Sequence, residues 1–534
     1  MLYEFVRMAV IVICCIVSGL SAVNALQAQR YQIPVLRRDL LGNLEQLLIL
    51  NGVVGILTAL LNWYLPILLA MAIRQEARRE NFCAWVVLAG FALATFLVWF
   101  SKHRRIQQKK PMVFTHRVCR LLAVVAVLVV LLALIISALG FSPYLVFIVS
   151  DYLVLLAAVI MRPIEERINK KYYNQARRKL TAHKDLIRIG VTGSFGKTQV
   201  KLMLRTLLAQ KYRVLSTPPS FSTAMGISRV VNDQLTDKHQ VLITEMGAQQ
   251  RGEIKEMAKL VRPQYAVLTC VGNAHLDSFG SIEAAAQTKF ELMEALPPDG
   301  KAFFGSDGSY GDRLYALCKS EKYRAGLAGA DSGFYMRAEH IETGSSGTRF
   351  ELICSDGSRA WATTRLLGLF SVKNIALSAA VARQLDLSMA EIIQGIEKLK
   401  PTRHRLQLIQ GDISVIDNSL NTLHEGAQEA LQVLKDFPGR RILVTAGLND
   451  LEENADDVNY AYGMQAAGCA DYVVLIDPES TKSVMRGLMR RGFPKSSVRM
   501  VSDLTDAAEL VREIAGKGDS VLYEGVYPED ETEE

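Results

Sequence analysis

The stretch GVTGSFGKT, Gly190–Thr198, decides the fold of the central part of this chain. It overlaps the end of the apolar, β-branched run Leu186–Val191 and precedes the amphipathic run Thr198–Gln210. This pattern predicts a strand, a loop of small residues and a helix. Consecutive backbone N–H groups in such a loop close on phosphate oxygens, and the helix N-terminus adds partial positive charge. The stretch therefore predicts a nucleoside triphosphate site.

Each residue of this loop has an expected role. The turn around the phosphates consists of Gly193, Ser194 and Gly196. Lys197 is expected to reach the β- and γ-phosphates, and the Thr198 hydroxyl is expected to bind Mg²⁺. The spacing departs from the common GxxxxGK[ST] pattern, because Val191 stands at its first glycine.

The first 162 residues hold most of the apolar excess of a chain that is 50% hydrophobic. We predict a transmembrane domain of about five helical spans, each near the roughly 20 residues that cross a hydrocarbon core. The expected spans are Val6–Leu26, Leu47–Ile73, Phe82–Phe100, Leu121–Ala138 and Pro143–Met161. Residues 163–184 are expected to form a basic linker helix. The spans contain almost no charge of the kind that marks an ion or substrate path, so a transporter is disfavoured.

Basic residues flank the fourth and fifth expected spans. One group is Lys102, Arg104, Arg105, Lys109, Lys110, Arg117 and Arg120; the other is Arg162, Arg167, Lys170, Lys171, Arg177, Arg178 and Lys179. Short loops of this kind stay cytoplasmic, which predicts a multi-pass protein of the cell membrane with its later domains in the cytoplasm. The basic groups abut spans and lack interleaved aromatics, so we expect contact with membrane lipids and no nucleic acid. The eight cysteines show no metal or disulfide spacing.

From about residue 185 the pattern alternates strand-like and helical runs, which predicts α/β domains with helices on both faces of a parallel sheet. A central domain is expected over residues 185–398 and a Rossmann-like, doubly wound domain over residues 399–527. Residues 528–534 form an acidic tail. The expected fold is thus an α-helical transmembrane bundle followed by two α/β domains, the first with the phosphate loop.

Polar residues follow the expected strands of the central domain. Glu245 closes VLITE, and His275 lies in LTCVGNAHLDSFGS. Ligands of open α/β sheets bind beyond the carboxyl ends of the strands. A carboxylate and an imidazole there indicate Mg²⁺ coordination beside the nucleotide. Lys289 lies on the following helix, in AAQTKFELM, where the alternative interpretation is an ordinary surface lysine.

The order TGSFGKT, TEMGAQQRGEI and VLTCVGNAHLDSFGSIEAAAQTKFELMEALPPDG resembles the central domain of Mur ligases, over roughly residues 187–524. It is most similar to the members that add D-alanyl-D-alanine to UDP-muramoyl tripeptide. The resemblance implies an ADP-forming enzyme that uses ATP and Mg²⁺ to activate a carboxylate as an acyl phosphate. An amino acid or dipeptide amine then attacks it. The implied acceptor is a cell-wall precursor, either a UDP-muramoyl peptide or a lipid-linked relative.

The resemblance also assigns roles to individual residues. It implies catalytic roles for Lys197, His275 and Lys289, metal binding by Thr198, Glu245 and His275, and ATP contacts by Asn374, Arg405 and Asp417. Lys289 matches a lysine that is carbamylated in several Mur ligases. Carbamylation converts the amine into a carboxylate on a long arm, which suits a hard cation.

Several positions depart from the family pattern. The segment DNSLNTLH replaces the usual DDSYNANP, Ser222 and Lys373 replace a common Asn and His, and membrane spans replace the family's UDP-binding domain. Two alternatives therefore remain open. One is a ligase that builds a poly-γ-glutamate type of polymer, and the other is a degenerate nucleotide-binding scaffold at the membrane.

Overall fold

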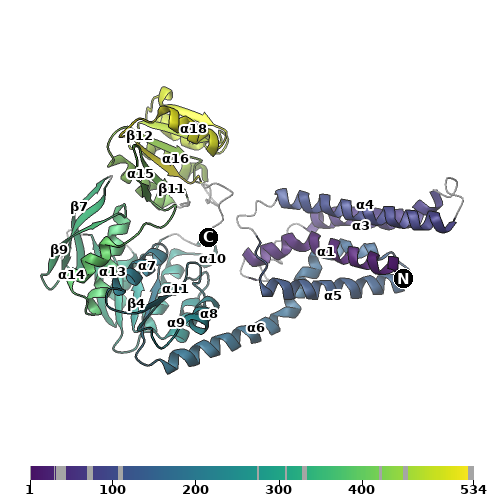
Figure 1. Ribbon diagram of the computed structural model, residues 1–534, viewed down its shortest axis with the longest axis horizontal. Helices are drawn as coiled ribbons and strands as arrows, with labels where there is room; N and C mark the ends of the chain where they lie inside the picture. Colours follow the sequence, from purple (N-terminus) through teal and green to yellow (C-terminus); the bar gives the residue numbers. More distant parts are fainter. Residues whose placement is uncertain are drawn as a thin grey trace. The chain divides into compact units, whose positions relative to one another are not determined.

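The computed structural model describes residues 2–28, 31, 44–68, 76–105, 112–272, 276–306, 310–327, 333–344, 346–419, 424–448 and 455–526. The chain divides into two compact units, Met1–Lys171 and Tyr172–Glu534. The described secondary structure of the first unit consists of helices, and the second unit holds two β-sheets with their helices (Figure 1).

The helical unit consists of long apolar helices. They are α1 (Leu2–Ala28), α3 (Leu44–Leu68), α4 (Glu76–Arg105), α5 (His116–Ala138), the 3₁₀ helix η1 (Pro143–Val149) and the first part of α6 (Ser150–Ala182). Four apolar stretches are long enough to cross a membrane: Tyr3–Gln27, Phe82–Phe100, His116–Ala138 and Pro143–Ala182. Within α3, the apolar stretch whose side chains are described is shorter, Asn51–Leu65. Residues 69–73 of the expected second span lie outside the described residues.

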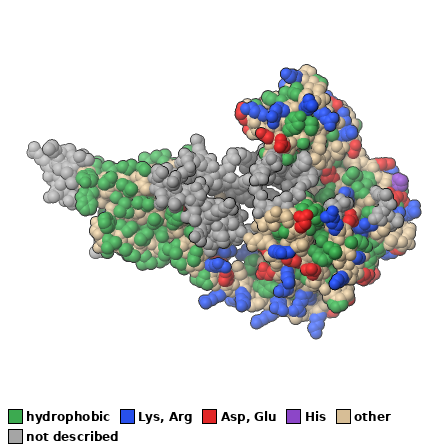
Figure 2. Space-filling view, turned by 180° about the vertical axis from the view of Figure 1, so that it is seen from behind, with side chains coloured by type: hydrophobic (Ala, Val, Ile, Leu, Met, Phe, Trp, Pro, Cys, Tyr) green, Lys and Arg blue, Asp and Glu red, His purple; other side chains and the backbone are tan. Residues whose placement is uncertain are grey.

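Hydrophobic side chains cover most of the described surface of this unit on the face that Figure 2 shows. Trp63 is 65% exposed, and Leu93 and Ile135 are similarly open. Soluble monomers rarely expose contiguous apolar surface on this scale. The surface and the helix lengths together suit a hydrocarbon environment.

The interior of the helical unit contains a polar cluster. The Nδ2 of Asn51 on α3 donates to Oδ2 of Asp151 over 2.9 Å and lies 3.4 Å from Oγ of Ser150. The Ser150 hydroxyl in turn donates to Oγ of Ser18 on α1 over 3.4 Å. All four residues are at most 1% exposed. Asp151 is therefore an acidic exception to the apolar character of the spans, and its cluster joins three helices.

Helix α6 continues without a break from the last span through the basic segment to Ala182, so the structure has one helix where the sequence predicted a span and a separate linker. Glu165, which is 6% exposed, accepts a hydrogen bond from Nε of Arg120 over 2.8 Å. Nε of Arg117 lies 3.7 Å from the same carboxylate. Two cations of the basic flank thus share one carboxylate within the helical unit, which balances one of their two charges.

The second unit contains a nine-stranded sheet in the order β2-β3-β1-β4-β5-β6-β7-β8-β9. The strands are β1 (Ile187–Thr192), β2 (Val214–Ser216), β3 (Val241–Glu245), β4 (Tyr265–Leu268), β5 (Lys301–Gly305), β6 (Glu321–Leu327), β7 (Met336–Gly344), β8 (Gly347–Cys354) and β9 (Arg359–Thr364). Pairing is parallel from β2 to β7, as predicted, and antiparallel from β7 to β9.

Helices pack on both faces of this sheet. They are α7 (Lys197–Leu208), α8 (Ala224–Gln234), α9 (Glu253–Val261), α10 (Leu276–Phe279), α11 (Ile282–Glu294), α12 (Tyr310–Leu317), α13 (Leu369–Gln384) and α14 (Met389–Glu397). One apolar core joins α7, α13 and α14 to the sheet, and a second joins α8, α9 and α11. The two cores fix the positions of the strand ends, because β1, β3, β4 and β5 are buried on both faces.

A six-stranded sheet follows, in the order β10-β11-β15-β12-β13-β14. Its strands are β10 (Gln407–Ile409), β11 (Ser414–Asn418), β12 (Arg441–Thr445), β13 (Tyr472–Ile476), β14 (Val498–Val501) and β15 (Ser520–Glu524). Its helices are α15 (His424–Lys435), α16 (Ala455–Ala466), α17 (Lys482–Arg490), the 3₁₀ helix η2 (Lys495–Ser497) and α18 (Leu504–Ile514). All pairs are parallel except β10 with β11, which gives the predicted doubly wound domain.

Candidate functional site

The phosphate loop lies between β1 and α7 and is held by close backbone contacts. Gly193 has φ +150°, and a Cβ there would lie 2.0 Å from Oγ1 of Thr269. Gly196 has φ +77° and forms the N-cap of α7. Both positions therefore need glycine. The hydroxyl of Ser194 donates to the Gly272 carbonyl over 3.1 Å, which ties the loop to the segment after β4.

Lys197 folds back over this loop. Its Nζ donates to the carbonyl oxygens of Gly193 and Ser194, each over 2.9 Å. Burial lowers the pKa of Lys197 from its ordinary value, while the Glu245 carboxylate opposes that shift. Arg405, in the segment before the second sheet, also lowers it through its positive charge. The ammonium group of Lys197 thus lies at the N-terminus of α7, and helix N-termini are favourable positions for bound anions.

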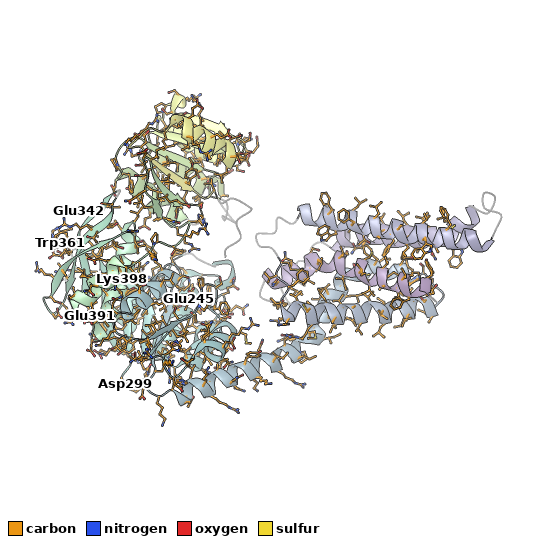
Figure 3. All side chains as sticks on the ribbon, in the orientation of Figure 1. Glu245, Asp299, Glu342, Trp361, Glu391 and Lys398 are labelled. Carbon is orange, nitrogen blue, oxygen red and sulfur yellow. The ribbon has the colours of Figure 1, made fainter. Side chains whose placement is uncertain are left out.

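Glu245 ends β3 beside the loop, because β3 pairs in parallel with β1 and places Glu245 opposite Val191 (Figure 3). The hydroxyl of Thr198 donates to Oε2 of Glu245 over 3.0 Å. The carboxylate is 5% exposed. His275, predicted as its companion metal ligand and as a catalytic residue, lies outside the described residues.

These residues fit a magnesium ion by their chemistry. Mg²⁺ prefers oxygen ligands and is usually bound through one or two carboxylates together with substrate phosphates. The hydroxyl of Thr198 and the carboxylate of Glu245 converge at the phosphate loop. The donor set is of the kind that Mg²⁺ takes.

Lys289 is buried inside the central domain, which removes the alternative of an ordinary surface lysine. It lies on α11, is 4% exposed, and its Nζ stands 5.1 Å from the ring centroid of Phe279. Burial and the positive charge of Lys197 lower its pKa to about 8. A lysine in this state holds a substantial neutral fraction near neutral pH, which an amine needs in order to react.

Helix α13 packs beside the loop and carries Asn374. The Nδ2 of Asn374 donates to Oε1 of Gln199 on α7 over 2.6 Å. A Cβ on Gly196 would lie 2.9 Å from the same Asn374 nitrogen. Asn374 therefore lines the start of α7, where the phosphate loop ends.

Asp417 lies on β11 of the second sheet with both carboxylate oxygens engaged. Its Oδ2 lies 2.7 Å from Nδ1 of His404, and its Oδ1 accepts the Ser419 hydroxyl over 2.7 Å. His404 adopts φ +59°. Both of these partners belong to the same domain as Asp417, so these contacts do not connect it to the phosphate loop.

Most of the predicted site residues lie together around the phosphate loop. Hydrogen bonds and close contacts bring together Gly193, Ser194, Gly196, Lys197, Thr198, Glu245 and Asn374. Lys289 and Arg405 lie near enough to Lys197 to interact with its charge. Asp417 is the described exception, since its hydrogen bonds join it to His404 and Ser419.

Two residues beside the site were missed in the sequence. Lys201 is 0% exposed and its Nζ bonds Oε2 of Glu245 over 2.8 Å. Its signal was a lysine inside the apolar stripe of α7, one turn after Lys197. Glu429 on α15 accepts a hydrogen bond from the backbone N–H of Phe370 at the start of α13, and burial raises its pKa to about 7. Local sequence carries no signal for that contact, because 59 residues separate the partners.

Family models match this chain over both α/β domains. A model of the Mur ligase middle domain matches residues 191–382, and a model of the Mur ligase, glutamate ligase domain matches residues 404–526. Together they cover more than half of the 534 residues.

Individual proteins agree with the family models. The UDP-N-acetylmuramoyl-tripeptide--D-alanyl-D-alanine ligase of Bacillus subtilis (strain 168) is 27% identical over 346 residues, which are 63% of this chain and 72% of that protein. The Escherichia coli (strain K12) ligase of the same name is 30% identical over 298 residues, which are 55% of this chain and 65% of that protein.

A solved structure shares the fold. The MurF ligase of Thermotoga maritima in complex with ADP superposes with a TM-score of 0.58 and 23% identity, covering 67% of this chain and 80% of that one. The phosphate loop, the two α/β domains and the family models give one answer. The chain belongs to the Mur ligase family, whose members are ATP-dependent, ADP-forming amide ligases.

Proposed function

We propose that this protein is a membrane-anchored Mur ligase that joins an amino acid or dipeptide to the carboxylate of a peptidoglycan precursor. The observation that carries the proposal is the convergence of Lys197, Thr198 and Glu245 on one loop, in a chain whose relatives add D-alanyl-D-alanine to a UDP-muramoyl tripeptide. The first unit supplies the anchor through its apolar helices.

In the proposed reaction the substrate carboxylate attacks the γ-phosphorus of ATP, which gives an acyl phosphate and ADP. The incoming amine then attacks the acyl carbon, loses a proton, and phosphate leaves with the former carboxylate oxygen. Phosphoryl transfer of this kind depends on positioning and charge neutralisation. The loop amides and Lys197 would bind the phosphates, and Asn374 and Arg405 would add further contacts to the nucleotide.

A magnesium ion would be held by Thr198 and Glu245, with His275 as the expected third ligand, and would neutralise charge on the phosphates. Carbamylated Lys289 would supply a second carboxylate on α11. The low pKa of Lys289 supports this modification, because only the neutral amine attacks carbon dioxide.

The apolar helices of the first unit suggest where the acceptor substrate is presented to the enzyme. The relatives are named for a UDP-linked muramoyl tripeptide, and in this chain apolar helices precede the ligase domains. We infer that the acceptor is presented at the bilayer, either as a lipid-linked muramoyl peptide or as its UDP-linked form. The basic second half of α6 would contact anionic headgroups on the cytoplasmic side.

The test is the dependence of ADP release on both substrates. The full chain in detergent is given ATP, Mg²⁺, a UDP-muramoyl tripeptide or its lipid-linked form, and D-alanyl-D-alanine or single amino acids. We expect ADP only when acceptor and amine are both present, and none from the Lys197→Ala variant. ADP release that does not depend on any of the amines tested would contradict the proposal.

Mass spectrometry of the product separates the alternatives. One added residue or dipeptide per acceptor supports the proposal. A ladder of products would indicate a polymerising ligase instead. A chain that binds ATP but forms no amide with any pair of substrates would indicate a scaffold. In that case Lys197→Ala would weaken ATP binding, and neither the variant nor the wild type would show turnover.

A further inference from the structure

Helix α7 carries a second lysine that the proposed reaction does not use. Lys201 follows Lys197 by four residues and Thr198 by three, so all three project from one side of the helix. Its neighbours on the buried face are Val200, Met203, Leu204, Leu207 and Leu208. Lys201 is itself 0% exposed.

An ammonium group in such a place needs compensation. Burying an unpaired charge is costly, and apolar residues of similar volume often serve a core equally well. Lys201 makes two bonds from its Nζ: 2.8 Å to Oε2 of Glu245 and 3.2 Å to the carbonyl oxygen of Pro218. Its charge is therefore matched to one carboxylate, the one that faces the phosphate loop.

The bonds to Glu245 are unevenly divided between its two oxygens. Oε2 accepts from both Lys201 and Thr198, over 2.8 Å and 3.0 Å. Among the described residues, no side chain donates a hydrogen bond to Oε1. The backbone N–H of Glu245 donates to Oγ1 of Thr217 over 3.1 Å, so the main chain is fixed as well.

We propose that Lys201 is a positioning residue for metal binding: by holding Oε2 it fixes the Glu245 carboxylate and leaves Oε1 available to the magnesium ion that accompanies the nucleotide. The inference rests on the proposed metal site at Thr198 and Glu245. Groups that orient metal ligands commonly set metal affinity without touching the ion.

The test compares ADP binding by the full chain in detergent, with MgCl₂ and with EDTA, using ADP itself as the probe. The quantity of interest is the magnesium enhancement, the ratio of the two dissociation constants. We expect Lys201→Met to reduce this enhancement by about 10- to 100-fold. The affinity of Lys201→Met for ADP in EDTA should stay near that of the wild type, because Lys201 does not contact the backbone amides of the phosphate loop.

Arg205→Met is the matched control. Arg205 lies one turn further along α7 and is exposed, so this variant removes a positive charge from the same helix. It should keep the full magnesium enhancement. An unchanged enhancement in Lys201→Met would overturn the proposal. So would a parallel loss of affinity with and without magnesium, which would indicate a role in folding the loop.

A double-variant cycle keeps the test valid if Lys201→Met fails to fold. Lys201→Met combined with Glu245→Gln removes both charges and leaves neither one buried alone. If Lys201 acts through Glu245, the double variant should show the same enhancement as Glu245→Gln. An additional loss would overturn the proposal. If the wild-type chain shows no magnesium enhancement of ADP binding, like Glu245→Gln, then the proposed metal site does not exist. The proposal for Lys201, which rests on that site, would fail as well.

Discussion

The hydroxyl of Thr198 donates a hydrogen bond to Oε2 of Glu245 over 3.0 Å. Thr198 lies in the first turn of α7 and Glu245 ends β3, 47 residues later, so the bond joins the end of the phosphate loop to the neighbouring strand. Parallel pairing of β1 with β3 brings the two ends together. This contact is the geometric basis of the proposed metal site.

The first prediction concerns that hydroxyl. Thr198→Val keeps the shape of the side chain and removes the oxygen, so magnesium-dependent turnover should fall by about 10- to 100-fold. Thr198→Ser keeps the oxygen and should retain most activity. Steady-state rates at several magnesium concentrations measure both. Equal rates for the Val and Ser variants would count against the hydroxyl as a ligand.

The second prediction concerns the pH dependence at Lys289, whose pKa burial lowers to about 8. The neutral fraction of this amine rises as the pH increases through that value, so carbamylation and activity should rise from about pH 7 to about pH 9. Added bicarbonate should raise activity further at the lower pH. Lys289→Met should lower the rate by about 10- to 100-fold and abolish the bicarbonate effect.

Lys259→Met is the control for that series, because Lys259 is an exposed lysine on the neighbouring helix α9. It should leave the rate and its pH profile unchanged. A Lys289→Met variant that still responds to bicarbonate would show that the modified group lies elsewhere.

Local sequence was sufficient to predict the phosphate loop, because its glycines, lysine and threonine lie in one short segment between a strand and a helix. The parallel strands near it were likewise predicted from their continuous apolar runs. Local sequence does not predict β2 or β6, because β2 has only three residues and the mixed run EKYRAGL of β6 shows no clear alternation.

Contacts between distant segments could not be predicted in the same way. The pairing of Lys201 with Glu245 depends on the register of α7 against β3, and that of Glu429 with Phe370 depends on the packing of α15 near α13. The cluster of Ser18, Asn51, Ser150 and Asp151 likewise requires three helices to be placed together. Each of these contacts forms only when the tertiary structure brings its residues together, so the sequence around each residue does not reveal its partner.

The third prediction follows from the pKa of Glu429, which burial raises to about 7 from an ordinary value of 4.5. The folded chain then holds this proton more tightly than the unfolded chain. Stability should therefore fall as the pH rises from about 4.5 to about 7 and stay lower above that range, by about 3 kcal/mol.

Glu429→Gln removes this titration and keeps an oxygen for the N–H of Phe370. The variant should be more stable than the wild type at about pH 8 and similar to it at about pH 5. Urea unfolding at the two pH values measures this. Glu513→Gln, at an exposed position of α18, is the control and should show no such difference. Equal destabilisation of Glu429→Gln at both pH values would contradict the assignment.

The fourth prediction concerns the polar cluster of the helical unit. Asn51→Leu removes the 2.9 Å donor of the buried Asp151 carboxylate and should cost about 1–3 kcal/mol. Thermal unfolding of the detergent-solubilised chain should show a lower midpoint. Thr58→Val is the control, because its hydroxyl bonds the Val54 carbonyl within the same helix. A midpoint equal to that of the control would argue against the cluster as an interhelical tie.

The most direct measurement follows an oxygen atom through the reaction. A muramoyl peptide acceptor whose reacting carboxylate carries the heavy oxygen isotope is incubated with the full chain, ATP, Mg²⁺ and D-alanyl-D-alanine. If the carboxylate is activated as an acyl phosphate at the Lys197 loop, each amide formed transfers one heavy oxygen to the released phosphate. Phosphate that contains only ordinary oxygen, while ADP and amide accumulate, would contradict this mechanism.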